Sequence, residues 1–108
     1  MDCPTRPARP LRALELRYVL TLYLYECGLL TVRQMVEAME AEGFSVGGRP
    51  SKTVSDALRW EVRRGRVMRV GRGRYAHQAM PRQTRDRIRR RVESIHDELS
   101  IQRWQYEV

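Results

Sequence analysis

The stretch that decides the fold covers residues 63–75, Arg63-Arg64-Gly65-Arg66-Val67-Met68-Arg69-Val70-Gly71-Arg72-Gly73-Arg74-Tyr75. Two short runs, 67–70 and 75–77, flank a glycine-containing segment. This pattern predicts a β-hairpin, because glycine permits the backbone conformation of a tight turn. Gly65 ends a helix before the hairpin, and Pro81 closes the unit.

Three helices are predicted upstream of this hairpin. The first covers residues 11 to about 26, the second runs from Val32 to about Glu42, and the third runs from Lys52 to about Arg64. Thr31 and Ser51 are expected as the N-caps of the second and third helices, and residues 29–30 as a short extended piece. The apolar side of the first helix is predicted at Leu11, Leu14, Tyr18, Leu22 and Tyr25, and that of the third at Val54, Ala57, Leu58 and Val62.

A fourth helix is predicted from residue 82 to about 104, and its apolar residues form a seam about two heptads long. Such a short seam must pack on a folded surface or on a second copy of the chain. The first helix is the expected receptor, since its second half is apolar nearly all round. The residues assigned to dimerisation are Tyr18, Leu22, Tyr25, Ile88, Val92, Ile95 and Leu99.

Between residues 11 and 80 this order of elements resembles the winged helix-turn-helix domain of small bacterial transcription regulators. The resemblance is carried by Leu29-Leu30-Thr31, by residues 51–58 and by residues 63–75. It implies an α+β, mainly α fold of three helices and a β-hairpin wing. Residues 1–10 would then be a flexible arm rich in proline, and residues 81–108 a C-terminal helix that serves dimerisation.

One position departs from the family pattern. The family usually places an apolar residue three positions after Leu58, where this chain has Glu61. Either the third helix is rotated slightly, or Trp60 covers a separate surface; the first alternative shifts the groove-facing residues by about one position. Packing of Trp60 against the last helix is favoured over stacking on a base.

The positive charge is concentrated in one part of the chain. The 108 residues carry a net charge of +8, and 20 of the 21 basic residues are Arg. Residues 49–91 hold 15 basic and 3 acidic residues, a local balance of +12, whereas the remainder is at −4. Because this segment includes the third helix and the wing, double-stranded DNA is the expected partner.

The predicted DNA contacts have separate roles. Ser51 and Lys52 near the start of the third helix suit phosphate, and Arg59 suits guanine in the major groove. Asp56 either accepts from cytosine or orients Arg59, and the ion pair is favoured. Arg72 and Arg74 suit the minor groove or the backbone. The full set of predicted DNA-binding residues is Arg49, Ser51, Lys52, Thr53, Ser55, Arg59, Arg63, Arg64, Arg66, Arg69, Arg72 and Arg74.

Other function classes find little support in the sequence. Cys3, Cys27, His77 and His96 occur singly, so neither a metal site nor a catalytic motif is predicted, and no cofactor or small-molecule ligand is expected. Cys27 is expected in the core. No membrane segment is evident, and a cytoplasmic, nucleoid-associated location is expected.

The leading hypothesis is a homodimeric, sequence-specific transcription regulator. A winged-helix adaptor for a protein partner and a nonspecific nucleoid-associated or RNA-binding protein are the alternatives.

Overall fold

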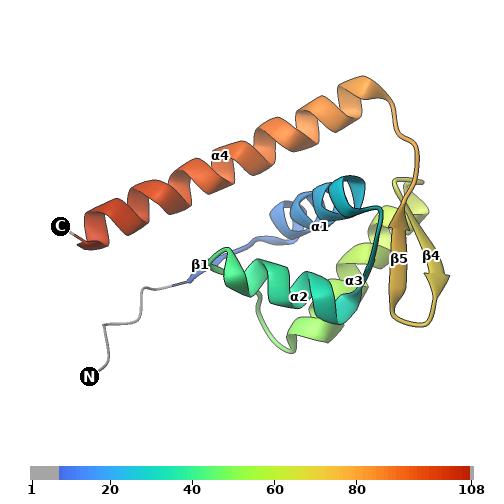
Figure 1. Cartoon of the computed structure of the whole chain (residues 1–108), viewed down its shortest axis with the longest axis horizontal. Coiled ribbons are helices and arrows are strands. Elements are labelled where there is room, and N and C mark those ends of the chain that lie inside the picture. The colour runs from blue at the N-terminus through green and yellow to red at the C-terminus, as the bar shows by residue number, and fades with distance from the viewer. Residues whose placement is uncertain (1–7, 108) are drawn as a thin grey trace.

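The computed structural model describes the backbone of residues 8–107 and the side chains of residues 8–101 (Figure 1). The fold is α+β and mainly helical, as predicted, and this order of elements is compatible with a winged helix. The described helices are α1 (Ala13–Cys27), α2 (Val32–Ala41), α3 (Pro50–Arg63) and α4 (Arg82–Glu107). The described strands are β1 (Arg9–Pro10), β2 (Leu29–Thr31), β3 (Phe44–Ser45), β4 (Val67–Gly71) and β5 (Arg74–His77).

The predicted arm is wrong for its last residues, and residues 1–7 lie outside the described part. Arg9–Pro10 form β1, which pairs in parallel with β3. The amide of Arg9 donates to the Gly43 carbonyl at 2.9 Å, and that of Leu11 to the Ser45 carbonyl at 3.0 Å. Proline lacks an amide donor, but the residues on either side of Pro10 supply the two that hold the strand.

Local capping fixes where α2 and α3 begin. The Thr31 hydroxyl accepts from the Gln34 amide at 3.1 Å, and the Gln34 side chain accepts from the Thr31 amide at 2.8 Å, which confirms Thr31 as N-cap. Ser51 is not the N-cap of α3. That helix begins two residues earlier than predicted, with Arg49 as N-cap, because Pro50 is favourable at the first helical position.

The predicted hairpin is confirmed as β4 and β5, and β2 adds to it in the antiparallel order β2-β5-β4. Leu30, Tyr75 and Arg69 are aligned across the three strands. Side chains alternate between the faces of a strand, so these three share one face of the sheet. Tyr75 on that face is buried.

The core lies between α1 and the elements around it. Leu16, Val19, Leu20 and Leu24 of α1 are buried, and none of them was in the predicted apolar stripe. Of the predicted residues, Leu22 is buried, Leu11, Tyr18 and Tyr25 pack against the core, and Leu14 is wrong because it is 47% exposed. The periodicity is ambiguous here because α1 is covered on more than one side, by α3 and by α4.

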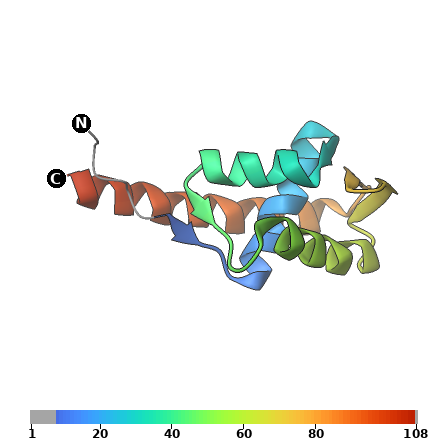
Figure 2. The same ribbon diagram turned by 90° about the horizontal axis from the view of Figure 1, so that it is seen from below.

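Helix α4 packs along α1, as Figures 1 and 2 show, and its C-terminal end extends beyond the rest of the fold. The seam residues Ile88, Val92, Ile95 and Leu99 are all buried within a single chain. The first helix is therefore the receptor, as predicted. Because these side chains are buried without a second copy, their assignment to a dimer interface stays a prediction.

Candidate nucleic-acid interface

A pocket of about 290 Å³ lies between α3 and the hairpin. Six residues line it, three from α3 and three from the hairpin: Ser55, Arg59, Val62, Arg69, Gly73 and Tyr75. The sheet register directs Arg69 and Tyr75 to the same face, and one face of α3 supplies the opposite wall. The structure thus brings three predicted DNA-binding residues, Ser55, Arg59 and Arg69, to a single groove.

The first half of α3 presents polar side chains beside this groove. Ser51 and Lys52 are exposed, and Arg49 at the N-cap is exposed as well. Thr53 is half-buried, and its hydroxyl donates to the Gly47 carbonyl at 2.7 Å. Thr53 therefore holds the loop before α3. The sequence analysis predicted Thr53 as a DNA contact and did not predict this structural role.

Asp56 is an ion-pair partner on the α3 surface. Lys52 Nζ donates to its carboxylate at 2.9 Å, and the Arg59 guanidinium lies 3.9 Å from it. The hydrogen bond from Lys52 holds the pKa of Asp56 below its ordinary value. Asp56 therefore stays ionised near neutral pH and lies close enough to orient Arg59.

The hairpin adds exposed guanidinium groups beside the groove. Arg69, Arg72 and Arg74 are exposed, and Gly73 adopts a φ of 68° at the tip, a conformation that glycine adopts without strain. Within residues 8–101, none of these three arginines has a carboxylate within ion-pairing distance. Their charges are therefore available to an anionic partner.

Arg66 is not a phosphate contact, in contrast to the prediction. Its side chain is buried, and Nε donates to Glu61 at 2.7 Å. Glu61 is 0% exposed and also accepts from Arg17 of α1 at 2.8 Å. Glu61 thus occupies the inward position that the family pattern gives to an apolar residue.

Because Glu61 faces inward, the side chain that follows it turns toward the groove. Val62 is 37% exposed and lines the pocket, so its assignment to the core is corrected. No sequence pattern predicted that Val62 or Tyr75 would line this pocket.

Trp60 is also placed differently from the prediction. It is 52% exposed, and the guanidiniums of Arg17 on α1 and Arg63 on α3 lie 5.8 Å and 5.6 Å from its ring centroid. Arg63 and Arg64 at the end of α3 are exposed. Of these two, Arg63 is partly engaged with the indole ring.

The cysteine and histidine residues do not gather into a site in the part described. Cys27 is exposed, which corrects its assignment to the core. His77 lies beside Tyr25, and His96 lies 3.4 Å from Glu42. Among the described side chains, no group of three or more His, Cys, Asp or Glu is placed to hold a metal ion.

Comparisons with known proteins add no further constraint. No family model, curated protein or solved structure matches the chain. Between residues 8 and 107, no helix is both long and apolar enough to cross a membrane.

Proposed function

We propose that this chain is a winged-helix protein that binds double-stranded DNA and regulates transcription. The observation that carries the proposal is the groove between α3 and the hairpin, where Arg59 and Arg69 line one pocket. Exposed Arg72 and Arg74 extend this basic surface to the tip of the hairpin. A folded surface with clustered guanidiniums on a helix and a β-hairpin is well suited to phosphate and base edges.

In this proposal α3 enters the major groove and the hairpin is the wing. Arg59 reads guanine, because a guanidinium donates two parallel hydrogen bonds to its major-groove edge. Ser51 and Lys52 at the start of α3 contact phosphate, where the helix dipole and free amides favour an anion. Arg69, Arg72 and Arg74 bind the flanking backbone or the minor groove.

Selection of bound duplexes from a random-sequence pool, followed by anisotropy titrations at near-physiological salt, tests the proposal. An enriched motif that binds at least tenfold more tightly than random duplex, single-stranded DNA and RNA is expected. Equal affinity for all duplexes would show that the chain binds DNA nonspecifically and is not a sequence-specific regulator. Preference for RNA, or no nucleic-acid binding, would overturn the proposal.

We propose separately that the chain forms a homodimer. Its interface cannot use the α4 seam while that seam packs on α1 of the same chain. A dimer that exchanges α4 between chains would keep the same contacts, since such an exchange replaces each intrachain contact with an identical one. Light scattering at increasing concentration tests whether the mass is 12.8 kDa or twice that value.

A further inference from the structure

A second basic pocket of about 280 Å³ lies at the far end of α3, where the chain enters α4. Arg64 and Gly65 form one side, and Met80, Thr84 and Arg87 lie on the other. The two sides are connected by a backbone hydrogen bond of 3.1 Å from the Gln78 amide to the Arg66 carbonyl. The pocket thus joins two elements that the sequence separates by about twenty residues.

The charge in this pocket is not compensated. Arg64 and Arg87 are exposed, and within the described side chains neither has an ion-pair partner. Arg66, which also lines the pocket, is bound to Glu61. That single carboxylate serves Arg17 as well, so these three side chains together carry one net positive charge.

Two other pockets in the described part of the chain differ from this one, whereas the α3–hairpin pocket, lined by Arg59 and Arg69, also has no lining acid. The pocket one turn further along α4 is lined by two arginines and two carboxylates, namely Asp86, Arg89, Arg90 and Glu93. The pocket beside β3 contains Glu40 and no basic residue. Arg64 and Arg87 thus share a pocket whose lining contains no carboxylate.

We infer that the pocket between Arg64 and Arg87 binds a phosphate group. Two guanidiniums supply several N–H donors in fixed fork geometry, and the Thr84 hydroxyl supplies a further donor. The phosphate is either a diester of the DNA backbone or a free phosphate. The diester case rests on the proposed function, because it extends the same interface from the α3–hairpin groove to α4.

Titration of the full chain with inorganic phosphate, followed by backbone amide NMR at constant ionic strength, tests the pocket itself. Saturable shifts of the Gly65, Thr84 and Arg87 amides are expected. They should disappear in the double variant Arg64→Ala/Arg87→Ala and persist in Arg90→Ala, which removes one guanidinium from α4 outside the pocket. The titration of the wild-type chain needs no variant, so it tests phosphate binding in the pocket even if the double variant fails to fold.

Duplex binding separates the two sources of phosphate. If the backbone is the source, the double variant should bind duplex DNA about tenfold more weakly than Arg90→Ala, and the slope of log affinity against log salt should fall by about 1 for one lost phosphate contact. Saturable phosphate shifts with unchanged duplex affinity would support a free phosphate. Absence of such shifts, together with equal duplex affinity of the double variant and Arg90→Ala, would overturn the inference. If the wild-type chain binds no duplex, the proposed function is wrong. The phosphate titration alone then tests whether the pocket binds phosphate.

Discussion

Glu61 of α3 and Arg66 in the turn before β4 form a buried ion pair, with Arg66 Nε 2.7 Å from Glu61 Oε2. The other carboxylate oxygen accepts from Arg17 of α1 at 2.8 Å. One carboxylate therefore joins three segments of the fold and fixes the rotation of α3. That rotation directs Ser55, Arg59 and Val62 toward the hairpin.

Replacement of this carboxylate should destabilise the protein strongly. Glu61→Ala leaves the buried Arg66 without its partner, and removal of one member of a buried pair costs about 3–5 kcal/mol. Urea denaturation followed by circular dichroism measures this loss in the free energy of unfolding. The double variant Glu61→Leu/Arg66→Met should lose much less, because the buried Arg66 guanidinium is then removed together with its partner. A cost below about 1 kcal/mol for Glu61→Ala would contradict the role of the pair.

The order of elements could be predicted from sequence because local signals determine it. Gly28, Gly65 and Pro81 mark ends, Thr31 caps a helix together with its near neighbour Gln34, and the glycines near residue 72 mark the hairpin. These preferences act over a few residues. The same locality explains why the polar residues of α3 and of the hairpin could be assigned to one surface.

Burial of charged residues could not be predicted, because their partners lie far away in the sequence. Arg17 is 44 positions from Glu61, and Arg9 is 89 positions from Glu98. A charge count treats Arg66 like Arg69, although one is buried and the other exposed. Only the packing of α1 against α3 and α4 determines which of these two arginines is buried. The same packing leaves Leu14 outside the core.

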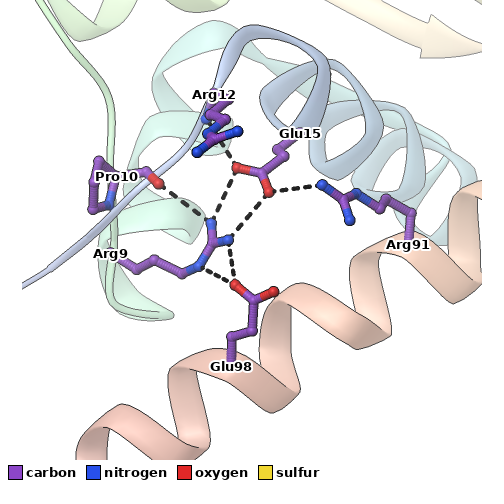
Figure 3. Close-up of polar contacts among 6 residues, drawn as sticks. All are labelled: Arg9, Pro10, Arg12, Glu15, Arg91 and Glu98. Carbon is purple, nitrogen blue, oxygen red and sulfur yellow. Dashed lines mark hydrogen bonds and ion pairs between the residues drawn. The ribbon is translucent and has the colours of Figure 1, made fainter.

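The carboxylate of Glu15 should make stability depend on pH. It is 4% exposed and accepts from Arg9 and Arg91, each at 3.1 Å, and from the Arg12 amide at 3.0 Å (Figure 3). The hydrogen bonds from Arg9 lower the pKa of Glu15 below its ordinary value of 4.5, although burial acts in the opposite direction.

A lowered pKa in the folded state stabilises the protein above the pKa of the unfolded chain. This contribution is lost as the pH falls below about 4.5 and through the lower folded-state value. Denaturation midpoints measured from pH 7 to pH 3 should therefore fall more steeply for the wild type than for Glu15→Gln. Parallel profiles for the two proteins would show that the Arg9–Glu15 contact contributes nothing to the dependence.

The α4 seam should contribute to the stability of a single chain. Ile95 is fully buried, and truncation of such a side chain to alanine costs about 2–5 kcal/mol. Ile95→Ala should lower the melting temperature by a similar amount at every protein concentration, whereas the exposed Ile101→Ala should have little effect. If Ile95→Ala halves the mass in solution but leaves the melting temperature unchanged, the seam belongs to a dimer interface instead.

DNA affinity should fall steeply with salt. If about six arginine or lysine side chains neutralise phosphates, affinity should drop roughly a thousandfold between 50 and 200 mM salt. Arg69→Ala should reduce the slope of log affinity against log salt by about 1. Arg33→Ala on α2 is the matched control, since Arg33 is exposed but paired with Glu37 outside the groove. A flat salt response of the wild type is incompatible with the electrostatic part of the proposal.

Arg59 and Arg72 should differ in how they affect sequence preference. Arg59 lines the α3–hairpin pocket and is proposed to read guanine, so Arg59→Ala should relax the preference at particular base pairs by about 1–3 kcal/mol. Arg72 lies exposed at the hairpin tip, so Arg72→Ala should weaken binding to all duplexes alike. Selection from the same random pool with each variant measures both profiles. If the two profiles lose preference at the same base pairs, α3 and the hairpin do not have separate roles in recognition.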